Sequence, residues 1–319
     1  MNKKQRGLLI LAALGLGWWL LDSFVLWQEI SEQRYALHTL TEIKVICRSR
    51  FQGRRAIDAA FARMKELEKK FNYFAPDSEL AQINQKAFRQ EIPLSADMHA
   101  ILTLALAGSE ISGGAFDITV TPISRLYGFG AGQKQAPDQR NIQNQLQGVG
   151  WQNVRLDSQK QTVRLLQPRA QLDLGGIAKG YAVDEAVKVL RRHGIHSALV
   201  NAGGNIYALG QNRGKPWRIA IRNPRASEET LQVFELRDEA CATSGDYEQY
   251  FTEDGRRYAH IFNPQTGRPA NLENQLASVT VIADSAARAD LLSTACFVLG
   301  EKKSAIFPER KFFYNPLAD

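Results

Sequence analysis

The first 27 residues restrict the fold of this chain more than any other part of the sequence. Residues 1–6 carry three basic side chains, and residues 7–21 contain no charge at all. After Asp22 the apolar run continues to Trp27. A stretch of about 20 apolar residues spans a bilayer, and basic residues before it favour a cytoplasmic N-terminus. We therefore expect residues 1–27 to be an uncleaved membrane anchor, with the rest of the chain on the outer side.

Two other interpretations of this segment stay open. A cleaved signal peptide would have small residues at its cleavage site, whereas Trp18, Trp19 and Trp27 occupy the region where they should lie. No cysteine follows the run for lipid attachment. A buried helix of a soluble domain is the second alternative, but such a helix rarely begins with a basic cap and then lacks polar residues for four turns.

Composition excludes several classes of protein for the remainder. A chain of 319 residues that is 44% hydrophobic forms a folded globular protein, and three scattered cysteines do not make a disulfide scaffold or a zinc site. Without residues 1–27, which hold three Lys or Arg and one Asp, the formal net charge falls from +7 to +5. A mildly basic chain of this size does not require nucleic acid as a partner.

Helical and strand patterns alternate along the rest of the chain, which favours an α+β fold. We expect residues 28–36 to be a polar connector and residues 37–319 to be one domain. The sequence Asp254-Gly255 predicts a hairpin turn. Helices are expected at Arg55 to Phe71, Glu79 to Gln85, Ala96 to Ser112, from Ala178 to His193, and after Asp284 as far as Gly300. Strands are expected at Glu42 to Ser49, Asn153 to Leu156, Thr162 to Leu166, Ser197 to Asn201, Trp217 to Ile221, Leu231 to Leu236, Glu248 to Thr252, Arg257 to Phe262 and Ala277 to Ala283.

The common phosphate-binding and hydrolase motifs are absent. The chain has no Walker A loop, no dinucleotide-binding G-x-G-x-x-G, no H-E-x-x-H and no G-x-S-x-G. In contrast, we expect Leu172 to Gly180 to end a strand and open a helix through Gly175 and Gly176. Amide groups at such a helix start, with Lys179 beside them, can hold a phosphate. The alternative is a turn that needs glycine only for its backbone geometry.

A second pair of residues points to a metal ion. Asp290 and Thr294 lie four residues apart on a predicted helix and therefore share one face. A carboxylate and a hydroxyl are hard oxygen ligands, which suit Mg²⁺ better than zinc. Taken alone, the pair is more typical of a solvated or locally bonded helix face than of a metal site.

Seven ordered segments together resemble the ApbE-like family of FAD:protein FMN transferases over residues 37 to 300. The matching segments are Ser78-Glu-Leu-Ala-Gln-Ile-Asn84, Gly114-Ala-Phe-Asp117, Asp173-Leu-Gly-Gly-Ile-Ala-Lys-Gly-Tyr-Ala-Val-Asp184, Asn201-Ala-Gly-Gly-Asn205, Thr243-Ser-Gly-Asp-Tyr247, His260 to Gly267, and Ala289-Asp-Leu-Leu-Ser-Thr294 with Val298-Leu-Gly300. The resemblance implies a T-fold-like α+β domain, FAD as substrate, Mg²⁺ as helper, and a membrane-tethered enzyme on the periplasmic side of the cytoplasmic membrane.

The resemblance also implies roles for individual residues. The carbonyl of Ala178, with Asp290 and Thr294, would hold the metal. Contacts to FAD would come from Phe74, Ala115, Phe116, Asp117, Gly175 and the chain at Phe262. Lys179 would add positive potential at the phosphates, and His260 is the candidate base, with a pKa expected to suit neutral pH.

The implied reaction attaches FMN to a Thr or Ser hydroxyl of an acceptor protein, expected to be a membrane redox subunit, with release of AMP. Two alternatives are an accessory protein that binds FAD without transferring it and a FAD pyrophosphatase that gives free FMN. The chain itself contains no acceptor-like Asp-x-x-[Ser/Thr]-Gly-Ala-[Ser/Thr] segment.

The chain departs from the family pattern in a few places. Thr39-Leu-Thr41 occupies the region of the family's Met-Gly-Thr, Asn72-Tyr-Phe74 replaces Ser-Thr-Tyr, and Asn263 stands where Asp is common. After Gly300 only nineteen residues remain, and Lys311 to Tyr314 is the candidate for the closing strand. A disulfide between Cys241 and Cys296 is left open.

Overall fold

The computed structural model describes residues 14–17, 27–130, 132–226 and 228–315. Its centre is a seven-stranded sheet with the order β1-β2-β6-β7-β10-β13-β14, in which every neighbouring pair is antiparallel. The strands of this sheet are β1 (Gln28–Ala36), β2 (Thr39–Cys47), β6 (Ala198–Ala202), β7 (Asn205–Leu209), β10 (Glu239–Gly245), β13 (Ser278–Ala283) and β14 (Arg310–Tyr314). Helices and an antiparallel sheet in one unit confirm the predicted α+β class.

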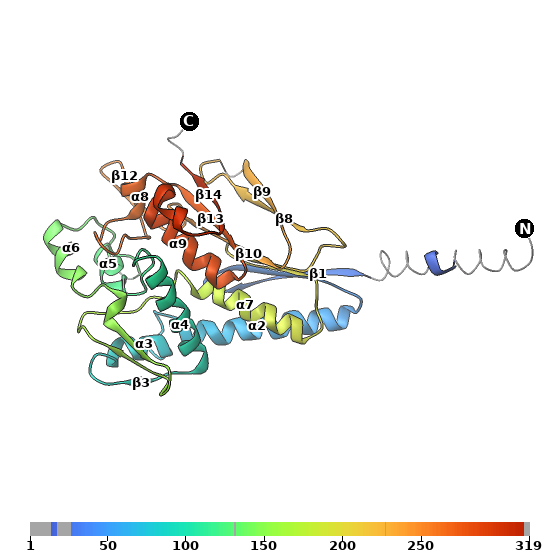
Figure 1. Ribbon diagram of the computed structural model, residues 1–319, viewed down its shortest axis with the longest axis horizontal. Helices are drawn as coiled ribbons and strands as arrows, with labels where there is room; N and C mark the ends of the chain where they lie inside the picture. Colours follow the sequence, from blue (N-terminus) through green and yellow to red (C-terminus); the bar gives the residue numbers. More distant parts are fainter. Residues whose placement is uncertain (1–13, 18–26, 131, 227, 316–319) are drawn as a thin grey trace, which may run out of the picture.

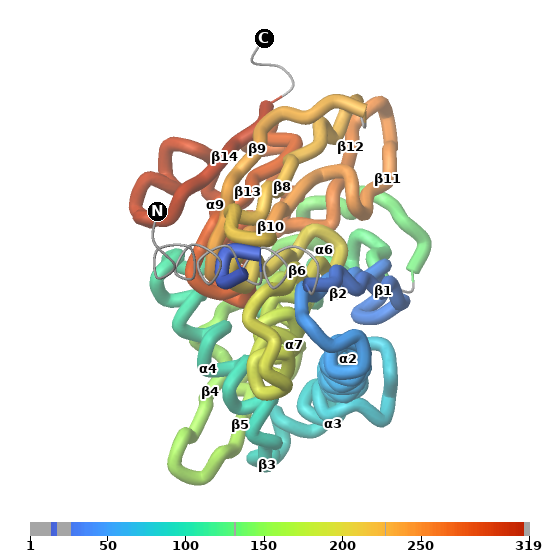
Figure 2. The backbone as a smooth tube through the Cα atoms, turned by 90° about the vertical axis from the view of Figure 1, so that its right-hand side faces the viewer, coloured from blue at the N-terminus to red at the C-terminus, as the bar shows by residue number. Residues whose placement is uncertain are grey.

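The two faces of this sheet are covered by different elements. The helices α2 (Arg50–Phe71), α7 (Ala178–Arg192) and α9 (Ala286–Lys303) lie on one side, and the hairpin of β8 (Trp217–Arg222) and β9 (Thr230–Leu236) lies on the other (Figures 1 and 2). Because side chains alternate along a strand, Ala240 and Ala242 face the helices whereas Cys241 packs toward the hairpin. The main core therefore lies between sheet and helices, and a smaller one lies under the hairpin.

Local sequence explains where the helices begin. Ser49, Ser78 and Ser95 each cap the helix that follows by accepting a hydrogen bond from its first turn. The other helices are α3 (Glu79–Lys86), α4 (Ala96–Ile111), α5 (Thr121–Leu126), α6 (Gln139–Leu146) and α8 (Ala270–Asn274), with 3₁₀ turns η2 (Trp151–Asn153) and η3 (Ser304–Ile306). The remaining strands are β3 (Ile92–Pro93), β4 (Val154–Asp157) and β5 (Thr162–Leu165), which form one small sheet, and the hairpin of β11 (Tyr250–Glu253) and β12 (Arg256–Ala259).

Most of the predicted elements are confirmed within a few residues. The β11–β12 hairpin turns at Asp254 and Gly255, both of which have positive φ angles of 49° and 72°. The closing strand predicted around Lys311 to Tyr314 is β14, which pairs with β13. Gly300, at φ 75°, interrupts the last helix where its end was expected.

Several predictions are wrong. The expected connector at residues 28–36 is the edge strand β1, which pairs with β2 along its whole length. Its polar residues occupy both faces, since Glu32 and Arg34 lie half-buried on the same face as Ile30 and Ala36, so the strand has no clear alternation. Its turn at Leu37 and His38 has positive φ angles without any glycine to signal it. Leu172 to Leu174 is not a strand, and Asp284, which we expected to cap the last helix, is not its cap, since Ser285 caps α9. Strands β7 and β10 were not predicted.

The expected anchor lies mostly outside the described residues, which include only residues 14–17 and Trp27 of it. Within the described part of the chain, no helix is both long enough and apolar enough to cross a membrane. The three cysteines Cys47, Cys241 and Cys296 are buried as free thiols, so the disulfide left open above does not form here.

Candidate functional site

A cavity of about 990 Å³ lies between the helix ends, the central sheet and the β8–β9 hairpin. Its walls include the turn after β1, the turn between β6 and β7, the start of α7 and the middle of α9. Every site residue predicted from the sequence lines this cavity. These residues are Phe74, Ala115, Phe116, Asp117, Gly175, Ala178, Lys179, His260, Phe262, Asp290 and Thr294.

The candidate metal ligands come together where α7 and α9 meet. A side chain at Gly180 would lie 2.2 Å from the carbonyl oxygen of Ala286, so glycine is required for the close approach of the two helices. At this contact the Gly180 N–H donates to Oδ2 of Asp290 at 2.9 Å. The Thr294 hydroxyl donates back to the carbonyl of Asp290 at 3.3 Å. Ala178, Asp290 and Thr294 are thus brought to one side of the cavity.

A carboxylate fixes how these two helices are placed. Asp184 on α7 accepts hydrogen bonds from the N–H groups of Ala286 at 2.8 Å and Ala287 at 2.9 Å, and so caps the start of α9. Burial raises the pKa of Asp184 to about 6, and the two N–H donors oppose that rise. The positions of Ala178 and Asp290 are therefore coupled through a contact about two turns away on α7.

The glycine turn before α7 lies against the metal-ligand candidates. A Cβ atom at Gly176 would lie 3.1 Å from the Phe116 ring and 3.2 Å from Oγ1 of Thr294, so a larger residue would fit only if these side chains shifted. At the start of α7, the N–H groups of Ala178 and Gly180 are already bonded to the Leu174 carbonyl and to Asp290. Those of Gly176 and Lys179 have no partner among the described residues and are available to a ligand. Lys179 Nζ contacts the Gly175 carbonyl at 3.4 Å and lines the same cavity. This arrangement suits an anionic group.

Asp173, Glu248 and Asp290 line the cavity and have no salt-bridge partner within the described residues. Burial raises the pKa of each, and Lys179 opposes the rise in all three. Asp290 additionally raises the pKa of Glu248. A buried carboxylate that lacks a cation is unfavourable, so a divalent ion at Asp290 would relieve this cost.

The residues fit Mg²⁺ better than a transition metal. The described part of the chain holds no group of three or more His, Cys, Asp or Glu that could bind a metal by itself. Mg²⁺ commonly uses one or two carboxylates together with water and substrate phosphates. One buried carboxylate and one hydroxyl, from Asp290 and Thr294 beside a turn suited to phosphate, match that pattern.

Aromatic residues and a polar turn also line the cavity. Phe74 is 60% exposed although it is a large apolar side chain, and its ring packs edge-on against Tyr73 with 5.3 Å between the centroids. Such an exposed ring at a cavity can stack on a planar ligand. Asp117 is occupied by the fold, since its carboxylate accepts from the Thr119 N–H and hydroxyl and from the Trp151 N–H. It therefore holds the turn, and Ala115 and Phe116 are buried within that turn.

His260 lies in the cavity wall with one nitrogen engaged. Its Nδ1 is 3.2 Å from the Gln249 carbonyl, which selects the tautomer with the proton on Nδ1 and leaves Nε2 as an acceptor. Burial and then the charge of Lys179 lower the pKa of His260 to about 4. The prediction of a pKa suited to neutral pH is therefore wrong, because burial disfavours the charged ring. Phe262, two residues on, is buried against Tyr127 and Phe129.

Sequence reasoning did not single out three residues that shape this site. Asp173 and Glu248 add negative charge to the cavity wall. Asp246, which is 4% exposed, binds Arg225 at 2.6 Å and Arg257 at 3.4 Å and thereby ties the β8–β9 loop to the β11–β12 hairpin. Asp173 and Asp246 both lie inside the matched segments, next to the glycine turns. That position is the sequence signal by which they could have been identified as site residues.

Comparisons with known proteins agree on one family. The model of the ApbE family matches residues 37–312. The protein named FAD:protein FMN transferase of Haemophilus influenzae is 37% identical over 257 residues, which is 78% of this chain and 74% of the relative. Its namesake in Treponema pallidum is 34% identical over 293 residues, 87% of this chain and 80% of the relative.

Solved structures support the same grouping. The ApbE protein of Thermotoga maritima superposes with a TM-score of 0.82 at 32% sequence identity, covering 90% of this chain and 94% of that chain. The flavinyl transferase ApbE of Pseudomonas stutzeri, in its apo form, superposes with a TM-score of 0.80 at 32% identity, covering 90% and 91%.

Proposed function

The chain belongs to the ApbE family, and we propose that it is an FAD:protein FMN transferase that uses Mg²⁺, attaches FMN to a Thr or Ser hydroxyl of an acceptor protein and releases AMP. The observation that carries this proposal is the meeting of Asp290, Thr294 and Ala178 with the glycine turn before α7 in one cavity. A divalent cation suits the oxygen ligands of Asp290, Thr294 and Ala178, and an anionic phosphate suits the start of α7.

The reaction exchanges one phosphorus–oxygen bond for another. The acceptor hydroxyl oxygen bonds to the phosphorus on the FMN side of the pyrophosphate, and the bond from that phosphorus to the AMP oxygen breaks. The hydroxyl proton leaves to a base, and AMP departs with the bridging oxygen. Such a transfer depends on alignment and on neutralising charge more than on covalent help from the protein.

The residues of the chain divide this work. Asp290, Thr294 and the carbonyl of Ala178 would hold Mg²⁺, which when bound neutralises phosphate charge. Lys179 and the free N–H groups of Gly176 and Lys179 provide further positive potential that is fixed before the substrate arrives. Phe74 can stack on a ring of FAD. Nε2 of His260 is neutral at pH 7 and can accept the hydroxyl proton directly.

We also propose that residues 1–27 anchor the enzyme in the cytoplasmic membrane with the domain on the periplasmic side. The basic cap and the uncharged run of residues 7–21 support this proposal. It suits an acceptor that is itself a membrane redox subunit. Fractionation of cells that express the full chain, followed by protease treatment of intact spheroplasts, tests the topology; a protease-resistant domain would contradict it.

The activity is tested by incubating the protein with FAD, Mg²⁺ and candidate acceptor proteins. Mass spectrometry should find FMN added to a Thr or Ser of an acceptor, and chromatography should find one AMP for each FMN attached. Asp290→Ala should abolish both products, whereas Glu301→Ala, which removes an exposed carboxylate from the same helix, should not. Free FMN in place of labelled acceptor would identify a pyrophosphatase instead.

A further inference from the structure

The β8–β9 hairpin is a separate two-stranded sheet laid over the open face of the central sheet (Figure 1). Strand β8 alternates strictly, with Trp217, Ile219 and Ile221 buried. The first two of these side chains pack with Cys241 and Ile282 of the central sheet. The hairpin is therefore fixed by its inner face, while its outer face and edges are left for other contacts.

One edge of β8 borders the catalytic cavity. Among the described residues β8 pairs only with β9, so half of its peptide groups have no strand partner. Residues 219–222 line the same cavity as Asp290 and Thr294. A strand edge with unpaired N–H and C=O groups is a template for another extended chain.

The sequence around this edge is strongly basic. Residues 211–226 contain five Lys or Arg and no Asp or Glu. Two of these, Arg218 and Arg222, are exposed on the same outward face of β8, and neither forms a salt bridge within the described residues. Arg225 is already held by Asp246. The loop and β9 add Glu228, Glu229 and Glu235, the last directly across from Arg218, so residues 211–236 keep a net charge of 5 − 3 = +2. This surplus would attract an acidic partner.

We propose that the free edge of β8 is where the acceptor protein docks, as an extended acidic segment that adds a strand to the hairpin. Main-chain hydrogen bonds to β8 would hold the segment. Its alternate side chains would then point in opposite directions, with acidic ones near Arg218 and Arg222 and the hydroxyl residue toward Asp290. This proposal rests on the proposed transferase function and adds to it how the second substrate is recognised.

Binding can be measured apart from catalysis. The probes are two fluorescent twelve-residue peptides with one central Thr, one carrying four Asp residues and its twin carrying four Lys residues instead. Fluorescence anisotropy with the full chain, FAD and Mg²⁺ should show at least about tenfold tighter binding of the Asp peptide, and this preference should weaken with salt. Methylating alternate backbone nitrogens of the Asp peptide should weaken its binding in one register and leave it unchanged in the other.

The variant Arg218→Glu, at an exposed position outside the cavity lining, should weaken the preference for the Asp peptide and leave the affinity for FAD unchanged. Lys65→Glu is the matched control, since it makes the same charge change at an exposed position on α2. Equal binding of the two peptides, no binding of the Asp peptide, or the same loss in the control would overturn the docking proposal. A parallel loss of FAD affinity would assign the basic edge to FAD instead. Failure of the transferase function would appear separately, as absence of FMN from every acceptor.

Discussion

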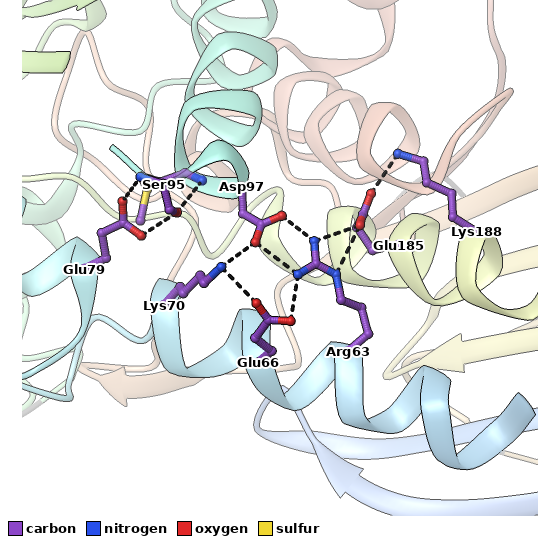
Figure 3. Close-up of polar contacts among 9 residues, drawn as sticks. Arg63, Glu66, Lys70, Glu79, Ser95, Asp97, Glu185 and Lys188 are labelled. Carbon is purple, nitrogen blue, oxygen red and sulfur yellow. Dashed lines mark hydrogen bonds and ion pairs between the residues drawn. The ribbon is translucent and has the colours of Figure 1, made fainter. Parts of the chain in front are cut away.

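Helix α7 lies beside two groups of carboxylates, and only one of these groups is neutralised by cations of the chain itself. On its outer side, Glu185 joins Asp97 and Glu66 around Arg63, whose guanidinium binds all three acids (Figure 3). At its start, Asp290 and Asp173 have only Lys179 as a nearby cation, and it forms a salt bridge with neither of them within the described residues.

The pKa values report the same contrast. Burial acts to raise the pKa of Asp97, but hydrogen bonds from Arg63 and Lys70 lower it below its usual value. Around the cavity, burial raises the pKa of Asp290 and is not overcome. The first group is completed by the chain itself and links α2, α4 and α7. The second is incomplete, which is what a site for an external cation requires.

The largest effect is expected for Asp290→Asn. Removing the charged ligand should lower kcat/KM for FMN transfer by on the order of 10²–10³-fold, because charge stabilisation at the phosphates is lost. The free energy of unfolding at pH 7 should stay the same or rise, since a buried carboxylate with a raised pKa is removed. Steady-state transfer assays and urea denaturation measure the two quantities. A variant that keeps its activity would show that the two carboxylate groups do not differ in function.

Arg63→Met should lower the free energy of unfolding and leave the activity nearly unchanged, which is the reverse of the result expected for Asp290→Asn. It leaves Asp97 and Glu185 without their arginine, and breaking a buried pair in this way costs about 3 kcal/mol of unfolding free energy. Activity per folded molecule should stay within about twofold. The control is Lys188→Met, which removes one 2.7 Å contact to Glu185 from a lysine that is 62% exposed and should cost less than about 1 kcal/mol. Equal losses in both variants would mean that the network is not centred on Arg63.

A smaller effect on stability is expected from Asp184, the carboxylate on α7 that caps the start of α9. Because the pKa of Asp184 in the folded chain, about 6, is above its ordinary value, the folded chain binds this proton more tightly than the unfolded chain. Its contribution to stability is therefore absent above about pH 7 and grows as the pH falls from 6 toward 4, by up to about 2 kcal/mol. Denaturation at pH 7 and pH 4.5 should show this gain in the parent chain and not in Asp184→Asn. Asp77→Asn, at an exposed position, should keep it.

The smallest effect concerns the protonation of His260, which should not change kcat/KM between pH 5 and 8. With a pKa lowered to about 4, the ring is already neutral across this range and becomes charged only near its lower limit. A profile of kcat/KM against pH, compared with that of His260→Gln, should show the acid limb that depends on His260 near pH 4. A limb near pH 6.5 would mean that bound FAD or Mg²⁺ restores the ordinary pKa.

The sequence by itself determined the local elements and the chemistry that could occur. Ser78 and Ser95 identify helix starts, Asp254-Gly255 identifies a hairpin, and Asp290 with Thr294 share a helix face, because each depends on residues only a few positions apart. The ordered motifs also identified the family and every residue proposed for the site, all of which line one cavity.

Only the tertiary structure decided which strands pair and which charges remain uncompensated. Polar β1 looks like a connector until β2 lies beside it, since an edge strand buries little and leaves its pattern weak. The pKa of His260 depends on burial by distant segments, and whether Asp97 or Asp290 finds a cation depends on helices brought together from different parts of the chain. Burial and long-range charge pairing arise between elements, so no window of sequence contains them.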